Sequence, residues 1–309
     1  MNTHDESEMQ PLFQSDVVLG LWPIAGVTTI GVTSRDAEAT IATAIELGIT
    51  AFDTAFSYGL EGESDRYLGR AIRGDIDRFH VIGKVGQRYL ADETRVVDGA
   101  PETLRADAEE SLRRIGIERF GTLMLHSIDP NVEVERSAEA LLAMREAGLA
   151  DRIGLCNATE NQRQRFDAVC SCRAIQCPLN LLQTDSLTSL IPGAAANGAD
   201  VLVYWTLMKG LLAGKISPDH VFPPGDSRPN YEVFQGKPRA RAHRVVRDLR
   251  KIANETNRTV ADLSVSWTLS QPGVTAALVG ARRPDQIREA ANAAPLNPET
   301  LTRLLAVGV

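Results

Sequence analysis

Short apolar runs alternate with amphipathic segments over most of the chain. The apolar runs are continuous and contain few polar residues, which is typical of strands that a parallel sheet buries on both faces. This pattern predicts eight strands, at residues 17–22, 49–54, 79–85, 120–126, 152–158, 174–180, 200–207 and 274–281.

A segment with apolar residues at helical spacing follows each predicted strand. In residues 34–48, for example, Ala37, Ile41 and Ala44 share one helix face, and Gly48 suits the position just past the helix end. Helices are expected at 34–48, 64–74, 101–116, 137–150, 161–170, 187–199, 241–256 and 284–294, with one more at 260–273 before the last strand.

Eight strand–helix units predict an α/β fold, a (β/α)8 TIM barrel made by a single domain over residues 16–309. Residues 1–15 are expected to form a polar tail. The competing fold is a doubly wound sheet, but no G-x-G-x-x-G fingerprint follows the first strand. The longest irregular stretch, residues 216–238, is rich in Pro and Gly, and loops of this length are usually functional lids or disordered.

Composition and charge narrow the function classes. With 43% hydrophobic and 24% charged residues among 309, the chain has the composition of a globular protein. The formal net charge is −7 and there is no basic block, so we expect neither a nucleic acid nor a membrane surface as partner. The N-terminus lacks the features of a signal peptide and no apolar run approaches the length of a membrane span, which favours a cytoplasmic protein.

The cysteines do not predict a metal site. The pair Cys170 and Cys172 has no second cysteine pair or histidine at zinc spacing. We therefore interpret these two residues, together with Cys156 and Cys177, as ordinary buried or half-buried thiols.

Polar or aromatic residues stand at the ends of six predicted strands: Asp53, Lys84, His126, Asn157, Gln176 and Tyr204. In a barrel, the C-terminal ends of the strands open into one shared site. Taken singly, each residue has a structural interpretation: Asp53 could cap a turn, Lys84 could be a solvated strand end, and Tyr58 and Tyr204 could simply pack. Taken together on one barrel face, they indicate a site.

The chemistry of these groups is coherent. A free phenol has a pKa of about 10, and a nearby ammonium group is expected to lower it. Asp53 could hold Lys84 in place, and His126 could form a hydrogen bond with a substrate oxygen. The pattern therefore predicts a site that protonates an oxygen as it becomes negatively charged.

Motifs spread over nearly the whole chain resemble those of the aldo-keto reductases. They are "LGLWPIAG" (19–26), "FDTAFSYGLEGESDRYLGRAI" (52–72), "VIGKVG" (81–86), "LMLHSIDP" (123–130), "IGLCNAT" (153–159), "IQCPLNLL" (175–182), "YWTLMKGLLAGK" (204–215) and "VGARRPDQIREA" (279–290). The resemblance implies a catalytic tetrad of Asp53, Tyr58, Lys84 and His126, in which Tyr58 is the general acid. It also implies hydride transfer from NADPH, rather than NADH, to an aldehyde or ketone, with no metal.

The resemblance also implies where the ligands lie. Asn157 and Gln176 would hold the nicotinamide carboxamide, Tyr204 would stack on the nicotinamide, and Arg282 and Gln286 would hold the 2′-phosphate of NADP. A guanidinium suits a phosphate dianion. The full set of implied cofactor contacts is Gly20, Trp22, Asp53, Cys156, Asn157, Gln176, Tyr204, Trp205, Thr206, Leu207, Lys209, Gly210, Lys215, Gly280, Arg282, Gln286 and Glu289. The implied substrate pocket comprises Trp22, Phe56, Tyr58 and His126, bordered by residues 127–136 and 216–238.

Some positions depart from the family pattern. Cys156 replaces a serine, Trp205 and Thr206 replace Ser-Pro, and Ala290 replaces an asparagine near the adenine. These changes are expected to affect cofactor affinity more than the reaction. Because the chain ends at Val309, a short or missing C-terminal substrate loop and an open pocket are also expected.

Two other functions remain open from the sequence. One is a cofactor sensor or partner-binding protein on the same scaffold, which the resemblance to potassium-channel β subunits allows. The other is a barrel lyase or aldolase in which Lys84 forms a Schiff base. The sequence indicates neither the oligomeric state nor the physiological substrate.

Overall fold

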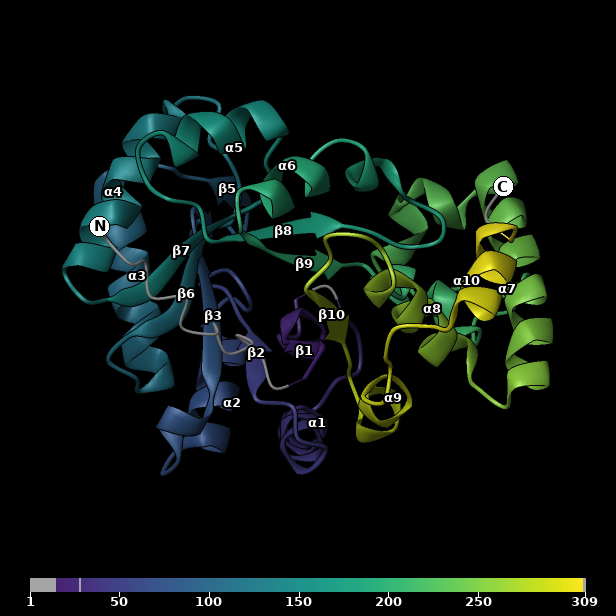
Figure 1. The fold of residues 1–309 in the computed structure, drawn as a ribbon. Coiled ribbons are helices and arrows are strands. Elements are labelled where there is room, and N and C mark those ends of the chain that lie inside the picture. Colours follow the sequence, from purple (N-terminus) through teal and green to yellow (C-terminus); the bar gives the residue numbers. More distant parts are fainter. Residues whose placement is uncertain (1–14, 28, 308–309) are drawn as a thin grey trace.

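A closed parallel barrel forms the centre of the computed structural model, which describes residues 15–27 and 29–307 (Figure 1). In ring order its strands are β1 (Val17–Gly20), β10 (Ala276–Gly280), β9 (Asp200–Tyr204), β8 (Ala174–Pro178), β7 (Ala150–Cys156), β6 (Phe120–Leu125), β3 (His80–Val85) and β2 (Ala51–Asp53). These are the eight predicted strands, so the predicted TIM barrel is confirmed. The predicted tail lies almost entirely outside the described residues.

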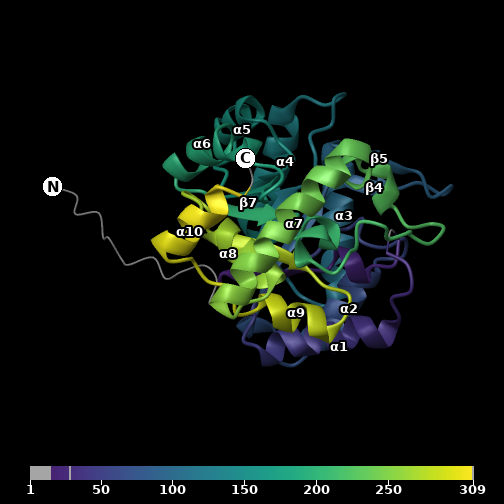
Figure 2. The same ribbon diagram turned by 90° about the vertical axis from the view of Figure 1, so that its right-hand side faces the viewer.

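Helices surround the barrel, as Figures 1 and 2 show from two directions. They are α1 (Ser34–Glu46), α2 (Glu63–Ile72), α3 (Pro101–Ile115), α4 (Val134–Glu146), α5 (Glu160–Asp167), α6 (Ile191–Ala196), α7 (Gly236–Thr256), α8 (Val260–Leu269), α9 (Pro284–Ala290) and α10 (Pro298–Leu305). Helix α6 begins later than predicted, with Pro192 in its first turn, a position that proline suits. None of the helices in the described ranges is long and apolar enough to cross a membrane.

Three features differ from the predicted pattern. A two-stranded antiparallel hairpin, β4 (Gln87–Tyr89) and β5 (Arg95–Val97), stands between β3 and α3. Helix α10 follows the last predicted helix. The stretch predicted to be irregular contains two short 3-10 helices, at Arg228–Asn230 and Glu232–Phe234, and α7 begins inside it.

The two faces of each strand explain where the polar groups lie. A small apolar cluster fills the barrel interior: Val18, Ala51, Ile82, Met124, Ala174, Leu202, Ala276 and Leu278. A larger cluster packs between the strands and the helices. Because side chains alternate along a strand, the residue two positions after an interior apolar residue also faces inward, but nearer the mouth. Asp53, Lys84, His126, Gln176 and Tyr204 each stand two positions after a member of the interior cluster.

Candidate active site

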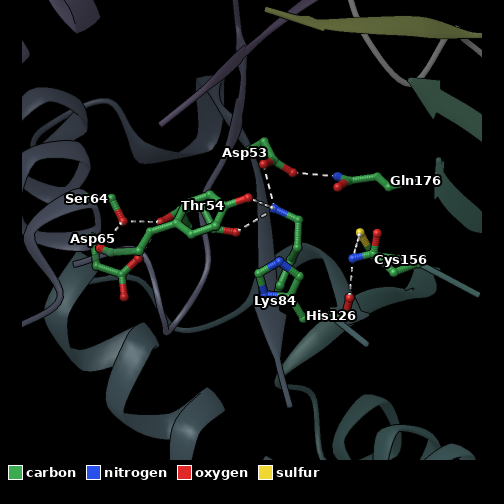
Figure 3. Close-up of polar contacts among 10 residues, drawn as sticks. Asp53, Thr54, Ser64, Asp65, Lys84, His126, Cys156 and Gln176 are labelled. Carbon is green, nitrogen blue, oxygen red and sulfur yellow. Dashed lines mark hydrogen bonds and ion pairs between the residues drawn. The ribbon is translucent and has the colours of Figure 1, made fainter. Parts of the chain in front are cut away.

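A hydrogen-bonded chain joins three of the predicted tetrad residues at the barrel mouth (Figure 3). Lys84 Nζ lies 2.5 Å from Asp53 Oδ1 and 3.1 Å from the Tyr58 hydroxyl oxygen. It also donates to the Thr54 carbonyl oxygen at 3.1 Å. The three N–H bonds of the ammonium group are thereby matched by three acceptors. Lys84 and Asp53 are buried, with side chains 1% and 2% exposed.

Tyr58 is held on the wall of the mouth by its neighbours. Its backbone carbonyl accepts a hydrogen bond from Ser64 Oγ at 2.9 Å, and its ring makes an edge contact with Trp22 at a centroid distance of 5.1 Å. Gly59 follows with a φ of +108°, a conformation that strongly favours glycine, and turns the chain toward α2. Tyr58 stands five residues after Asp53, and this turn places its hydroxyl within hydrogen-bond distance of Lys84 at the strand ends.

The expected lowering of the pKa of Tyr58 by Lys84 is wrong. Burial raises the pKa of Tyr58 well above its ordinary value, and the negative charge of Asp53 raises it further. Asp53 forms an ion pair with Lys84, so its carboxylate offsets the field of the ammonium group at the phenol. Tyr58 is consequently a protonated group at neutral pH.

His126 completes the tetrad from the end of β6. Its ring lies edge-on to that of Tyr58 at 5.7 Å between centroids. Burial lowers the pKa of His126 well below its ordinary value, and the positive charge of Lys84 acts in the same direction. The imidazole is therefore neutral. Its buried Nδ1 has no hydrogen-bond partner in the described part of the chain, which favours placing the proton on Nε2.

The amides predicted to hold the carboxamide are engaged within the protein. Gln176 Nε2 donates to Asp53 Oδ2 at 2.5 Å. Asn157 Nδ2 donates to the His126 carbonyl at 2.9 Å and to Cys156 Sγ at 3.3 Å, while its Oδ1 accepts from the Tyr204 hydroxyl at 2.6 Å. Their role toward a nicotinamide stays a prediction.

All four cysteines are free and buried, as the sequence analysis expected. Cys156 is the one in the site, and burial raises the pKa of its thiol to about 12. Because the thiolate is the reactive form, this cysteine is a poor nucleophile at neutral pH.

A cavity of about 480 Å³ opens above these residues. All of the residues predicted as cofactor contacts line it, from Gly20 and Trp22 at one end of the sequence to Gly280, Arg282, Gln286 and Glu289 at the other. Lys84 lies beneath the cavity wall. Phe56 is not among the lining residues; the guanidinium carbons of Arg88 and Arg114 lie 5.8 Å and 4.7 Å from the centroid of its ring. Ala290, expected near the adenine, is fully buried and does not line the cavity.

An aromatic and cationic cluster lies beyond Tyr204. The Trp205 ring makes edge contacts with Tyr204 at 5.4 Å and with Tyr231 at 5.9 Å, and Lys209 Nζ lies 4.1 Å from the centroid of the Tyr231 ring. The φ of Trp205 is +58°, which is rare for a bulky residue and strains the backbone. The side chain that replaces the family's serine thus joins strand β9 to the 216–238 segment.

Cations gather at the far end of the cavity. Burial lowers the pKa of Arg282, and the positive charges of Arg228 and Arg283 lower it further, whereas Asp226 opposes the shift. Asp226 is itself paired with Arg228, their side-chain atoms being 2.5 Å apart. Gln286 Oε1 accepts the Arg282 backbone N–H at 2.8 Å. The crowded guanidinium groups favour an anion in this region.

Sequence reasoning missed a buried network that supports Tyr58. Asp65 of α2 accepts hydrogen bonds at 2.6 Å from Thr54 Oγ1 and from Ser111 Oγ of α3, and Ser64 Oγ lies 2.8 Å from Thr54 Oγ1 (Figure 3). Burial raises the pKa of Asp65 to about 6. The sequence "GESDRY" suggests only an acidic helix start, because the neighbours of Asp65 come from elements far along the chain.

The β4–β5 hairpin contributes Gln87 and Arg95, which also line the cavity and were not predicted. Both are polar residues in strands of only three residues, so no periodic pattern singles them out.

Known proteins resemble this chain in sequence and in fold. The aldo-keto reductase YhdN of Bacillus subtilis (strain 168) is 34% identical over 284 residues, covering 88% of this chain and 83% of the relative. The NADH-specific methylglyoxal reductase of Escherichia coli (strain K12) is 27% identical over 314 residues, covering 93% of each. The glycerol dehydrogenase AKR11B4 from Gluconobacter oxydans has a solved structure with a TM-score of 0.87 and 30% identity, covering 94% of this chain and 90% of that one.

The model of the aldo/keto reductase family matches residues 16–308, nearly the whole chain. The aldo-keto reductases are oxidoreductases that use nicotinamide cofactors. The strand-end tetrad, the cavity and these relatives agree, and the chain belongs to the aldo/keto reductase family.

Proposed function

We propose that the protein reduces an aldehyde or ketone to the alcohol with NADPH, and that Tyr58 supplies the proton. The observation that carries this proposal is the hydrogen-bonded chain from Asp53 through Lys84 to the Tyr58 hydroxyl, beside the neutral His126. Tyr58 and His126 border one cavity, so a single carbonyl oxygen could meet both of them.

Each tetrad residue has a separate task. Tyr58 carries its proton at neutral pH and gives it to the substrate oxygen as negative charge develops there. Lys84 donates a hydrogen bond to the phenol oxygen, and this bond strengthens as the phenolate forms. Asp53 holds Lys84 in place, and the neutral N–H of His126 orients the carbonyl oxygen.

The residues that line the cavity fit a phosphorylated dinucleotide. The half-buried Arg282, crowded by Arg228 and Arg283, supports a site for the 2′-phosphate of NADPH, with Gln286 beside it. Tyr204 and Trp205 would contact the nicotinamide end, and Lys209 and Gly210 the pyrophosphate. When bound, the nicotinamide supplies hydride to the carbonyl carbon. One relative is named as NADH-specific, so the proposed NADPH preference rests on Arg282 of this chain.

The two alternative functions receive less support. A Schiff base on Lys84 requires a free amine lone pair, whereas Nζ is buried and donates to three acceptors. A cofactor sensor would not need the complete proton-donating arrangement that Asp53, Lys84, Tyr58 and His126 form. The proposed compartment is the cytoplasm, which the four free thiols support.

The substitution Tyr58→Phe tests the proposed proton donor. It keeps the ring that packs on Trp22 but removes the hydroxyl, so kcat should fall by roughly 10²- to 10⁴-fold. Cofactor binding, followed by quenching of tryptophan fluorescence, should stay close to that of the wild type. Wild-type kcat for Tyr58→Phe on a good aldehyde substrate would exclude Tyr58 as the proton donor.

A further inference from the structure

The β4–β5 hairpin is fixed beside the catalytic residues. Gln87 Nε2 lies 2.5 Å from the Oγ atom of Ser127, the residue that follows His126. The backbone N–H of Asp98 donates to the Gly86 carbonyl at 3.2 Å and closes the base of the hairpin. The hairpin therefore presents its side chains at a defined place on the cavity rim.

Arg95 of β5 extends from this hairpin toward the catalytic centre. Its guanidinium carbon lies 5.7 Å from the centroid of the Trp22 ring, which in turn lies 5.1 Å from that of Tyr58. The distance from the Arg95 guanidinium carbon to the centroid of the Tyr58 ring is therefore at most the sum of these two distances. Its positive charge acts to lower the pKa of both Tyr58 and His126, against the larger effect of burial at Tyr58. Arg95 consequently acts electrostatically on the reacting centre.

Within the described ranges, no carboxylate forms an ion pair with Arg95, and the same holds for Lys209 and Arg282 elsewhere on the cavity wall. On the same hairpin, Arg88 lies 3.6 Å from the buried Asp107. At the far end of the cavity, Lys215 pairs with Glu289, and Arg228 with Asp226. Arg95 is exposed, lies over the Trp22 ring and interacts with the Tyr89 hydroxyl, which leaves some of its five N–H donors available to a ligand.

The other groups at this end of the cavity carry no net charge. Tyr58 is protonated, His126 is neutral, and the charge of Asp53 is matched by that of Lys84. Among the described residues at this end, the guanidinium of Arg95 is the group that can bind an anion strongly, because it pairs well with carboxylates and phosphates.

We propose that Arg95 binds an anionic group of the substrate, so that the preferred substrates are small carbonyl compounds carrying a carboxylate or a phosphate. This inference rests on the proposed carbonyl reduction. The guanidinium carbon and the phenol ring come from different elements and each approaches Trp22, at 5.7 Å and 5.1 Å from its centroid, so we place the anion and the carbonyl at separate points of the cavity. An ω-carboxylated or terminally phosphorylated aldehyde fits this arrangement better than a 2-oxo acid, whose carboxylate adjoins the carbonyl.

Two matched pairs of substrates test the proposal. Succinate semialdehyde is compared with its methyl ester, and glyceraldehyde 3-phosphate with glyceraldehyde, with each kcat/KM measured in the wild type and in Arg95→Gln. The wild type should prefer the anion of at least one pair. Arg95→Gln should reduce kcat/KM for that anion roughly tenfold more than for its neutral partner, and the additional loss should lie mainly in KM. The pair with the larger effect identifies the anion as carboxylate or phosphate.

Arg105→Gln serves as the control, because it makes the same change of charge at an exposed residue of α3 that pairs with Glu109. Arg105→Gln should keep the wild-type preference for the anionic substrate. In the wild type, this preference should weaken as salt is added. Equal kcat/KM values within both pairs, or equal losses on all four compounds in Arg95→Gln, would overturn the inference but leave carbonyl reduction intact. Failure of the wild type to reduce any of the four compounds would count against the proposed function itself.

Discussion

Burial and charge pairing act against each other on the ionisable groups of this site: burial raises the pKa of Asp53, and the charge of Lys84 opposes that shift. Tyr58 and His126 both keep their neutral forms because desolvation is the largest cause of each pKa shift. The same effect acts on Asp65, beneath Tyr58, and there it makes the stability of the fold depend on pH.

The pKa of Asp65 is about 6 in the folded protein, against an ordinary value of 3.8. The folded state therefore holds this proton more tightly, so the contribution of Asp65 to stability is present below about pH 4 and is lost as the pH rises to about 6. The loss amounts to about 3 kcal/mol. We expect the substitution Asp65→Asn to remove this pH-dependent loss of stability. Urea unfolding from pH 3.5 to 7 should show the free energy of the wild type falling relative to that of Asp65→Asn, and parallel curves would contradict the assignment.

The sequence was sufficient to identify residues at the strand ends but not residues held by distant neighbours. Asp53, Lys84 and His126 follow apolar runs, so the two-residue period of a strand places them at the barrel mouth. Asp65 and Arg95 have no such pattern. Their environments depend on Ser111, Thr54 and Trp22, which only the folded chain brings near.

At the level of elements, the close packing of α2 on α3 holds the network beneath Tyr58 together. Gly69 makes this approach possible, because a Cβ atom at this position would lie 2.2 Å from the Ile115 carbonyl oxygen. Replacement of glycine by alanine inside a helix normally stabilises it by up to about 1 kcal/mol. Here the backbone contact reverses the expected sign.

Gly69→Ala should destabilise the protein by roughly 1–3 kcal/mol, because α2 must move away from α3. Gly193→Ala in α6 is the comparison, since the nearest atoms to its Cβ belong to the Glu160 carboxylate, 2.4 Å away, and not to the backbone. That carboxylate would have to shift against its bonds to Arg163 and Gln164, so thermal unfolding should show a loss for Gly193→Ala that is smaller than the loss for Gly69→Ala. A stabilised Gly69→Ala would show that the two helices can separate freely.

Elements with long periodic patterns were predicted well, and short ones were not. The barrel strands are apolar on both faces because helices cover them, which leaves a distinct signature in the sequence. Each strand of the β4–β5 hairpin has three residues that are all at least partly exposed, so neither length nor hydrophobicity marks it.

For the whole molecule, cofactor binding should be measurable as added stability. A ligand that binds only the folded state stabilises it by mass action, by about 2.7 kcal/mol at one hundred times its dissociation constant. If Arg282 holds the 2′-phosphate, Arg282→Gln should weaken NADPH binding by roughly tenfold or more and leave NADH binding unchanged. The thermal shift with NADPH should then approach the shift with NADH.

Arg303→Gln is the control for this experiment, because Arg303 lies on α10, pairs with Glu255 and does not line the cavity. It should retain the wild-type shift with NADPH. Equal shifts with NADPH and NADH in the wild type would instead mean that Arg282 does not discriminate between the two cofactors.

The hydrogen bond between Gln176 and Asp53 has a mechanical consequence. In the ring order of the barrel, β2 and β8 lie four strands apart in either direction, so this bond spans the full diameter of the opening. Lys84 ties the same carboxylate to β3. The bond between Gln176 and Asp53 therefore adds a side-chain tie across the mouth to the backbone hydrogen bonds that close the ring of strands. A ligand that takes the amide N–H groups of Gln176 would have to share them with this tie.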